Sequence, residues 1–283
     1  MIIVDLQQVM ISNFMQQIGN HTNIQIDEDL LRHMILNSLR SYNVKFRAQY
    51  GEMVIACDGH RYWRKELFPY YKVNRKKDRD ASEIDWHSLF AILNKIREEL
   101  KDFFPYRVIH IDVTEADDII GTLCHEFGNG MDDILIISGD KDFKQLQSYM
   151  KVKQYDPVRK KWMQENDPER YLKEHIIRGD RGDGIPNFLS SDNSLALKIR
   201  QKPVMQAKLD VWLDQEPEEF CDPEMLRRYR RNEALIDLTK IPEAVQGRIM
   251  DSYNAQTGKN RSQLFNYFIT YRLKNLMTDI DQF

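Results

Sequence analysis

The chain has 283 residues and a formal net charge of -3, and 42% of its residues are hydrophobic and 30% are charged. This balance excludes a simple basic clamp that coats nucleic acid, and the apolar content excludes a disordered polymer and predicts a sizeable core. The three cysteines, Cys57, Cys124 and Cys221, lack any paired spacing. Such cysteines favour a reducing compartment over a disulfide framework, so we expect a cytoplasmic protein.

Four short apolar runs predict buried β-strands at residues 2–6, 53–57, 108–113 and 134–138. Continuous runs without alternation suit a parallel sheet that is covered on both faces. Two of the intervening segments, residues 27–49 and 83–103, carry apolar residues at helical spacing. The alternation predicts a doubly wound α/β sheet. The amino terminus lacks the pattern of a signal peptide, and no window has the length of a membrane span, so we expect no membrane partner.

Residues 61–80 are strongly basic, with eight arginines and lysines against three acidic residues. A charge run of this kind is usually a solvated helix face, and Trp63 could simply pack in the core. Here, however, aromatic residues are interleaved with the cations: Tyr62, Trp63, Phe68, Tyr70 and Tyr71. Cations for phosphates and rings for unstacked bases are what single-stranded nucleic acid requires. We therefore interpret the segment as a nucleic-acid surface.

Acidic residues gather where the predicted strands end: Asp5, Asp58, the group Glu115, Asp117 and Asp118, and the pair Asp140 and Asp142. Ligands of an open parallel sheet lie beyond the carboxyl ends of its strands, so we expect these carboxylates to meet. They would repel one another unless a divalent cation neutralised them, and oxygen ligands without His or Cys select Mg²⁺ or Mn²⁺. Each acid singly could instead favour a helix start or cap it. Because acidic residues follow all four predicted strands, we favour a metal site over four separate helix caps.

The chain after residue 156 carries mainly helical signals. Asp167-Pro168, Lys202-Pro203 and Asp222-Pro223 each predict the start of a helix, and residues 262–277 predict an amphipathic helix. We therefore expect two domains, an α/β domain at residues 1–160 and a smaller helical domain at residues 161–283.

Five ordered acidic motifs resemble the flap endonuclease or 5' nuclease family. They are Ile2-Ile-Val-Asp5, Cys57-Asp58-Gly59, Glu115-Ala-Asp117-Asp118, Ser138-Gly-Asp140-Lys-Asp142 and Gly179-Asp180-Arg-Gly-Asp183-Gly-Ile-Pro186. Within the family the chain looks closest to the ribonuclease H branch of T-even-type bacteriophages. The resemblance implies a PIN-like α/β nuclease core, a helical arch near residues 61–82, and a helix-three-turn-helix-like element at residues 179–200 that grips duplex DNA.

The resemblance also implies roles for individual residues. One Mg²⁺, or Mn²⁺ in its place, would be held by Asp5, Asp58, Glu115 and Asp117. A second would lie between Asp117 or Asp118, Asp140, Asp142 and the pair Asp180 and Asp183. Hydrolysis would follow two-metal logic, in which Asp117 and Asp140 are central. Lys72 and Arg75 would contact the scissile phosphate.

Further cations would contact nucleic acid by the same resemblance: Arg61, Arg64, Lys65, Lys76 and Lys77 in the arch, and Lys198, Arg200, Lys202 and Lys208 near the duplex-binding element. That element would also hold a K⁺ ion. The group Arg227, Arg228, Arg230 and Arg231 is either a second patch or a solvated helix face.

The implied activity is that of a 5' to 3' exonuclease and flap endonuclease on RNA·DNA and DNA duplexes, which removes RNA primers from lagging-strand fragments during phage replication in the bacterial cytoplasm. Forked, flap or nicked DNA would be the substrate, a single-strand-binding protein and a sliding clamp would be partners, and the protein would be a monomer. Two alternatives share the acidic core or the fold: a PIN-type ribonuclease and a non-catalytic structure-specific DNA-binding protein. The basic arch and the complete acidic set argue against both.

Overall fold

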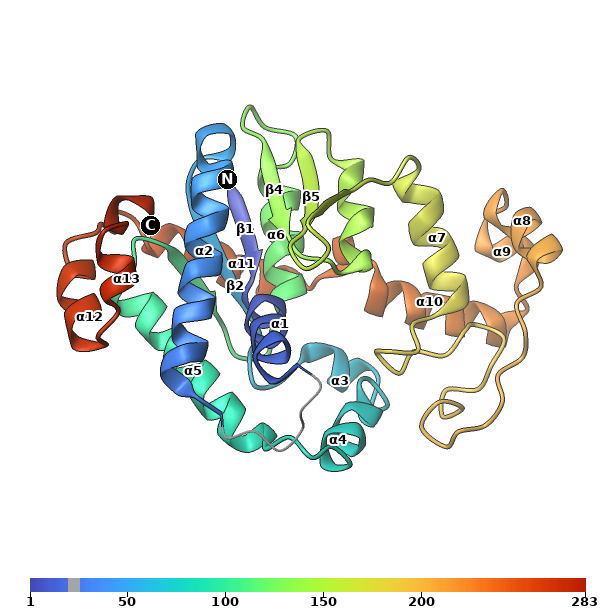
Figure 1. The fold of residues 1–283 in the computed structure, drawn as a ribbon. Coiled ribbons are helices and arrows are strands. Elements are labelled where there is room, and N and C mark those ends of the chain that lie inside the picture. Colours follow the sequence, from blue (N-terminus) through green and yellow to red (C-terminus); the bar gives the residue numbers. More distant parts are fainter. Residues whose placement is uncertain (20–25) are drawn as a thin grey trace.

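A six-stranded sheet forms the centre of the computed structural model, which describes residues 1–19 and 26–283 (Figure 1). The strands are β1 (Ile2–Asp5), β2 (Met53–Cys57), β3 (Arg107–His110), β4 (Ile134–Ile137), β5 (Val152–Asp156) and β6 (Lys161–Met163). Their spatial order is β3-β2-β1-β4-β5-β6, and only the pairing of β5 with β6 is antiparallel. The order reverses next to β1, so the neighbouring ends of β1 and β4 form the switch point at which such sheets bind ligands.

All four predicted strands are confirmed, with β3 shorter than expected. β5 and β6 were not predicted, because polar residues interrupt β5 and because β6 has only three residues, the first of which is a lysine. In β5, Lys153 is exposed, and Gln154 is buried because its side-chain amide donates hydrogen bonds to the carbonyl oxygens of Ser138, at 2.9 Å, and Asp140, at 2.6 Å. A buried polar residue with its own partners leaves no apolar run to recognise.

Helices cover both faces of the sheet because alternate strand residues point to opposite sides. Ile2 and Val4 of β1 join one apolar cluster and Ile3 joins the other. The first face is covered by α1 (Leu6–Ile18), α2 (Glu28–Tyr50), α5 (Trp86–Phe103), α12 (Leu264–Thr270) and α13 (Lys274–Met277). The second face is covered by α6 (Ala116–Phe127), α11 (Glu243–Ala255) and two short 3-10 helices, η1 (Lys141–Ser148) and η2 (Leu238–Lys240). The doubly wound architecture is therefore confirmed.

A third apolar cluster lies beside the sheet and joins the basic segment to the later helices. It includes Phe68 and Tyr71, which lie between α3 (Trp63–Leu67) and α4 (Val73–Asp80). These side chains pack with α7 (Pro168–Arg178), α8 (Gln206–Leu213), α9 (Pro217–Phe220) and α10 (Pro223–Ile236). Figure 1 shows α7 to α10 at one end of the molecule and α12 and α13 at the other. Residues after 160 thus contribute to all three clusters, and the division into two domains at that point stays a prediction.

The predicted helix starts are partly confirmed. Asp167 and Asp222 cap α7 and α10, each followed by proline. The start predicted at Lys202-Pro203 is wrong, since α8 begins at Gln206. The helix predicted over residues 262–277 is interrupted between α12 and α13, where Arg272 has a left-handed backbone (φ 54°) that an α-helix does not allow. The chain ends in a third 3-10 helix, η3 (Ile280–Gln282). Among the described residues no helix is long and apolar enough to cross a bilayer.

Candidate active site

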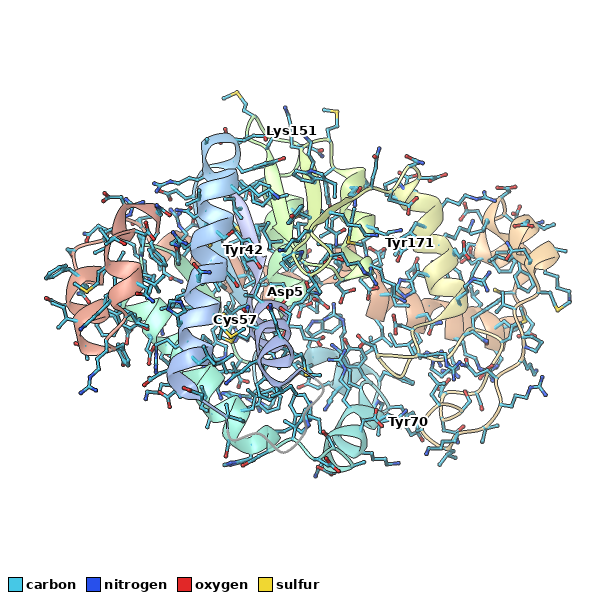
Figure 2. All side chains as sticks on the ribbon, viewed as in Figure 1. Asp5, Tyr42, Cys57, Tyr70, Lys151 and Tyr171 are labelled. Carbon is cyan, nitrogen blue, oxygen red and sulfur yellow. The ribbon has the colours of Figure 1, made fainter. Side chains whose placement is uncertain are left out.

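The predicted meeting of carboxylates takes the form of a cavity of about 420 Å³ at the carboxyl ends of the strands. Figure 2 shows Asp5 at the centre of the molecule, beside the start of α1. The charged residues that line the cavity are Asp5, Asp58, Asp117, Asp140, Asp142, Asp180 and Asp183 together with Lys72, Arg75 and Lys141. Seven of the nine predicted metal ligands and all four predicted catalytic residues therefore surround one space.

Asp5 is both a helix cap and part of the cavity wall. Its Oδ1 accepts a 3.1 Å hydrogen bond from the Gln8 N–H, and its Oδ2 accepts one of 3.1 Å from Ser138 Oγ. Burial raises the pKa of Asp5 to about 7, and the charge of Asp58 adds to the rise. Burial likewise raises the pKa of Asp58, whose Oδ1 accepts a 2.8 Å bond from the Ala116 N–H. Asp5 and Asp58 thus each accept a hydrogen bond from the start of a helix and also line the cavity, so the two interpretations of these acids are compatible.

Asp117, Asp140 and Asp142 also line the cavity. Burial raises the pKa of Asp117 well above its ordinary value, Lys72 lowers it in part, and the charge of Asp140 adds a smaller rise. Asp140 caps η1 by accepting the Asp142 N–H at 3.0 Å. Burial and the charge of Asp140 raise the pKa of Asp142 to about 7. Asp117 and Asp142 therefore resist ionisation as long as only protons and protein cations balance their charge.

The donor set fits a hard divalent cation. Asp5, Asp58, Asp117 and Asp140 offer carboxylate oxygens, which is the ligand type that Mg²⁺ and Mn²⁺ prefer. Oδ1 of Asp142 is buried and has no hydrogen-bond partner among the described residues. A buried carboxylate oxygen without a donor is costly, so a cation is the partner that this oxygen lacks.

Asp118 differs from Asp117 in the predicted ligand set. Its side chain is 0% exposed, and it accepts hydrogen bonds from Arg64 Nη1 at 2.7 Å, Trp63 Nε1 at 3.1 Å and the Glu115 N–H at 2.9 Å. Both oxygens are used in this way and Asp118 does not line the cavity, so the structure favours Asp117 of the two, and the role of Asp118 as a metal ligand stays a prediction. Sequence spacing could not distinguish it from Asp117, its neighbour on the same helical turn.

Glu115 is held by cations and a hydroxyl of this chain. Its carboxylate forms ion pairs with Lys72 and with Arg64, the latter at 2.9 Å, and accepts a 3.0 Å hydrogen bond from the Tyr71 hydroxyl. Burial would raise the pKa of Glu115, but Lys72 and Arg64 lower it. Glu115 therefore stays ionised and positions Lys72, and its role as a metal ligand stays a prediction.

Arg64 is a correction, because it was predicted to contact nucleic acid. It is 2% exposed, and besides Glu115 and Asp118 it donates a 2.9 Å hydrogen bond to the Leu235 carbonyl oxygen. A guanidinium enclosed by two carboxylates and a carbonyl group is not available to a phosphate. By contrast Arg61, Lys65, Arg75, Lys76 and Lys77 are exposed, as a nucleic-acid surface requires.

The aromatic residues of the basic segment divide in the same way. Phe68 and Tyr71 are buried in the third cluster, so their rings do not offer stacking surfaces for bases. Trp63 packs against the second cluster, as in the alternative interpretation that this residue belongs to the core. Tyr62 remains accessible, because it lines a second pocket of about 320 Å³ that shares Gln7, Asp58 and Arg75 with the acidic cavity.

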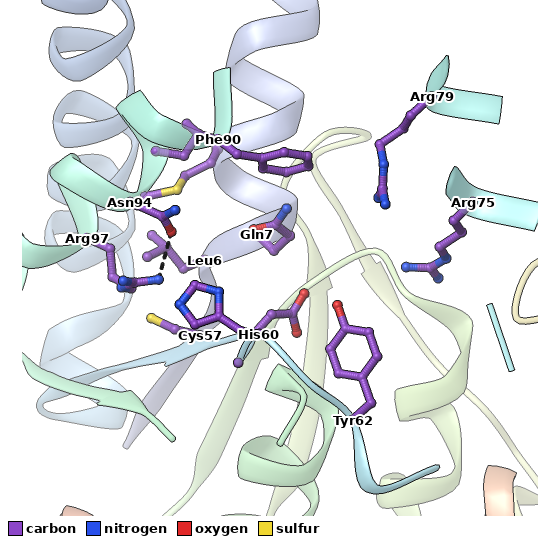
Figure 3. A pocket seen from close by; sticks show the side chains of 14 residues that line it. Leu6, Gln7, Cys57, His60, Tyr62, Arg75, Arg79, Phe90, Asn94 and Arg97 are labelled. Atoms are coloured by element: carbon purple, nitrogen blue, oxygen red, sulfur yellow. Dashed lines mark hydrogen bonds between the residues drawn. The ribbon is translucent and has the colours of Figure 1, made fainter. Parts of the chain in front are cut away.

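This second pocket contains residues that sequence reasoning missed. Figure 3 shows Arg75 and Arg79 extending from α4 opposite Phe90, Asn94 and Arg97 of α5. Arg97 donates a 2.8 Å hydrogen bond to the side-chain oxygen of Asn94. In the sequence these α5 residues belong to a helix that was recognised only by its apolar stripe. Their spacing of three and four residues was the available signal for a shared face.

Lys72 and Arg75 connect the arch to the acidic loop at residues 180–183. Arg75 Nη2 lies 2.6 Å from Asp183 Oδ1, and Lys72 Nζ lies 3.4 Å from Asp183 Oδ2. Burial would lower the pKa of Lys72, but Asp183 and Glu115 raise it, so the ammonium stays charged. Asp180 Oδ1 accepts the N–H groups of Gly182 and Asp183, which fixes the loop. The predicted cations therefore stand at the rim of the cavity.

His175 is a site residue that no pattern in the sequence indicated. It lies in the last turn of α7, its Nε2 is 3.2 Å from Asp180 Oδ2, and its Nδ1 is 3.6 Å from Asp142 Oδ1. Burial would lower the pKa of His175, but the hydrogen bond to Asp180 and the charge of Asp142 raise it. Only the packing of α7 beside η1 brings these residues together.

The predicted duplex-binding element has an unexpected local form. Residues 179–205, all of which the structure describes, contain turns and no helix, so the helices that flank this region are α7 and α8. Lys198, Arg200 and Lys202 are exposed in this region, and Lys208 is exposed in α8. In the second basic group, Arg227 pairs with Asp192 and Glu224, and Arg230 pairs with Glu218 and Glu233. Local pairing favours a solvated helix face for Arg227 and Arg230, whereas Arg231 is buried and donates a 3.1 Å hydrogen bond to the Pro186 carbonyl oxygen.

Comparisons with known proteins cover the whole chain. The family described as "5'-3' exonuclease, N-terminal resolvase-like domain" matches residues 1–176, and the family described as "T4 RNase H, C terminal" matches residues 167–283. Ribonuclease H of Enterobacteria phage T4 is 31% identical over 292 residues, which span 99% of this chain and 95% of that protein. The flap endonuclease Xni of Shewanella sp. (strain MR-4) is 30% identical over 134 residues, which span 44% of this chain and 48% of that protein.

Solved structures support the fold. The T5 D15 protein co-crystallized with metal ions superposes with a TM-score of 0.64 at 20% identity, covering 91% of this chain and 99% of that one. A pseudo-enzyme-product complex of the bacteriophage T5 D15 flap endonuclease with DNA and metal ions gives a TM-score of 0.64 at 18% identity, covering 91% and 99%. The resemblance and the fold class predicted from the sequence are thereby confirmed.

Proposed function

The chain belongs to the 5'-3' exonuclease family, and we propose that it is a divalent-cation-dependent 5' nuclease that hydrolyses phosphodiester bonds in flap, forked or nicked DNA and in RNA·DNA duplexes. The observation that carries the proposal is the cavity in which seven aspartates meet, with Lys72 and Arg75 at its rim. The names of the relatives, ribonuclease H and flap endonuclease, support activity on both kinds of substrate.

The aspartates of the cavity divide into two groups that would each hold a cation. Asp5 and Asp58 form one group, and Asp142, Asp180 and Asp183 form the other. Asp140 connects them, since its charge raises the pKa of both Asp5 and Asp142, and Asp117 interacts with Asp5 and Asp140. Mg²⁺ is the proposed cation, and Mn²⁺ can replace it. Two such cations would supply an activated water and neutralise the charge that develops on the phosphate.

Lys72 and Arg75 would bind the scissile phosphate. Both side chains are charged and both line the cavity. In the cation-free chain Lys72 pairs with Glu115 and Arg75 pairs with Asp183. A bound divalent cation would neutralise part of the negative charge of these acids and so weaken both ion pairs. The phosphate of a bound substrate would then bind to Lys72 and Arg75. Because they stand in fixed positions, they would stabilise developing charge without reorganising.

The second pocket would receive the single strand that leads to the scissile phosphate. Tyr62 and Phe90 offer rings, and Arg75, Arg79 and Arg97 offer cations, in a space that adjoins the acidic cavity (Figure 3). Rings for bases and cations for phosphates bind single strands without reading their sequence. The exposed Lys198, Arg200 and Lys202 would contact the duplex backbone, where shape and not sequence is recognised. A K⁺ site in residues 179–200 belongs to this proposal.

The biological role that follows is removal of RNA primers from lagging-strand fragments in phage DNA replication. The phage T4 relative, similar over nearly the whole chain, supports this assignment. We further propose that the protein is a monomer and that a single-strand-binding protein and a sliding clamp are its partners.

A substrate comparison tests the proposed function. One 5'-labelled RNA-primed duplex and its all-DNA equivalent, each with and without a 5' flap, are incubated with the full chain and Mg²⁺. We expect short products from the 5' end of both and cleavage near the flap junction. Cleavage restricted to single-stranded RNA would favour a PIN-type ribonuclease, and binding without cleavage would favour a structure-specific DNA-binding protein.

A further inference from the structure

His175 stands in an acidic cluster at the edge of the cavity, and its ring is 7% exposed. One possible ligand atom from each of Asp142, His175 and Asp180 lies within 4.8 Å of the other two. The sequence motifs predicted carboxylates here and no nitrogen ligand. The imidazole therefore changes the chemistry of this half of the site.

Asp180 holds the ring from one side. Its Oδ1 is fixed by the N–H groups of Gly182, at 2.7 Å, and Asp183, at 3.1 Å, while its Oδ2 lies 3.2 Å from His175 Nε2. A carboxylate fixed in this way accepts the Nε2–H, so the lone pair of a neutral ring is at Nδ1. Metal-ligating histidines are oriented by a carboxylate or carbonyl on their other nitrogen in the same manner.

The other ring nitrogen faces an unsatisfied carboxylate oxygen. His175 Nδ1 and Asp142 Oδ1 are both buried, and neither has a hydrogen-bond partner among the described residues. They lie 3.6 Å apart, which is too long for a hydrogen bond between them. Two ligands at about 2.1 Å from one cation, at a near-tetrahedral angle, lie roughly 3.4 Å apart. The separation suits two ligands of one ion.

We propose that His175 Nδ1 and Asp142 Oδ1 are direct ligands of a divalent cation, with Asp180 orienting the imidazole. This proposal rests on the proposed function, since it concerns the second cation of the same cavity. Lys141 Nζ, 3.5 Å from Asp180 Oδ2, is the other cation at this cluster and contacts the carboxylate that orients the ring.

A nitrogen ligand determines which ions the site prefers. Imidazole suits transition metals, and site affinity rises from Mn²⁺ through Co²⁺, whereas Mg²⁺ prefers oxygen. The half of the cavity at Asp142 is therefore selective for Mn²⁺ or Co²⁺ over Mg²⁺, and the half at Asp5 and Asp58, lined by carboxylates, lacks this preference.

Mn²⁺ bound to the full-length chain provides the test. Pulsed electron paramagnetic resonance detects the nitrogen coupling of a directly bound imidazole, and calorimetry gives the affinities for Mn²⁺ and Mg²⁺. The variant His175→Gln keeps a donor near the Nε2 position but has no atom equivalent to Nδ1, and His175→Asn keeps an atom near Nδ1 but none near Nε2. His125→Gln, at an exposed histidine that contacts Tyr149, is the matched control.

We expect nitrogen coupling in the parent chain and in His125→Gln, and none in His175→Gln, whose Mn²⁺ affinity falls about tenfold or more while its Mg²⁺ affinity changes little. In His175→Asn the coupling also disappears, and an amide oxygen retains part of the affinity. Bound Mn²⁺ without nitrogen coupling in the parent chain would overturn the ligand assignment and leave the proposed function intact. Absence of any Mn²⁺ or Mg²⁺ binding would overturn both.

Discussion

The backbone N–H of Lys72 donates a 2.7 Å hydrogen bond to the carbonyl oxygen of Asp183. The start of the basic helix α4 is therefore attached to the acidic loop at residues 180–183. Lys72 has a left-handed backbone (φ 53°), and Gly184, with φ 74°, lies so close that an added Cβ would be 2.8 Å from the Tyr70 carbonyl oxygen. Two segments more than one hundred residues apart thus form one unit at the rim of the cavity.

Replacing Gly184 by alanine tests this attachment. Gly258 is the matched control, because its φ of 75° is nearly the same while no described atom lies within 4 Å of an added Cβ. The left-handed backbone alone should cost about 1 kcal/mol of stability in Gly258→Ala. Gly184→Ala should cost more and should also lower the single-turnover cleavage rate, since the clash displaces Lys72. Equal unfolding free energies and equal rates for the two variants would contradict the attachment.

Lys72→Ala should reduce the rate of cleavage far more than the affinity for substrate. Lys72 is nearly buried at the cavity, so its charge acts on the reacting phosphate, and its loss should lower the single-turnover rate by about 100-fold. Lys76→Ala, at an exposed position of α4, should weaken binding and its salt dependence instead. If the rate of Lys72→Ala equals that of the parent chain, Lys72 does not act on the scissile phosphate.

Arg64→Ala should destabilise the fold, because it leaves Glu115 and Asp118 buried without their guanidinium. Removing one partner of such a buried pair costs about 3–5 kcal/mol. Arg61→Ala, only three residues away, should leave the unfolding free energy unchanged, because the Arg61 side chain is 74% exposed. Urea unfolding of both variants measures the difference, and similar stabilities would show that Arg64 is free to bind nucleic acid.

The raised pKa of Asp5 predicts a pH effect in the presence of a chelator. The folded-state pKa is about 7 and the unfolded one about 4, so the folded chain holds a proton between these values that the unfolded chain releases. The contribution of Asp5 to stability therefore falls as the pH rises from 4 to 7 and is constant above. Asp5→Asn keeps a capping residue but does not titrate.

Thermal unfolding of the two chains between pH 4 and 8 checks this prediction. The melting temperature of Asp5→Asn, relative to the parent chain, should rise with pH in EDTA, and saturating Mg²⁺ should stabilise the parent chain more than Asp5→Asn. A difference that does not change with pH would mean that Asp5 is ionised in the cation-free protein throughout this range.

The sequence was sufficient for the parts of the site that depend on strand ends. Apolar runs located β1 to β4, and the rule that ligands collect at the carboxyl ends of parallel strands brought Asp5, Asp58, Asp117 and Asp140 together. Local cap signals were equally reliable at Asp167 and Asp222. In each case the information lies within a few residues of the feature predicted.

The remaining features depend on contacts between distant segments. Arg61 and Arg64 look alike in the sequence, but only Arg64 meets Glu115 and Asp118 across the fold. Gln154 reads as a loop residue until its partners at Ser138 and Asp140 are known. His175 reaches the site only because α7 packs on η1. Burial of a polar side chain is decided by tertiary partners that a local pattern does not contain.

The central claim is that the aspartates of the cavity make the chain a cation-dependent 5' nuclease. Cleavage of a 5'-labelled flap substrate by the parent chain, Asp117→Asn and Asp140→Asn, each with Mg²⁺ and with EDTA, tests it most directly. We expect cleavage by the parent chain with Mg²⁺ only, and a loss of at least about 100-fold in both variants with substrate affinity retained. Cleavage in EDTA, or near-normal turnover by both variants, would contradict the account.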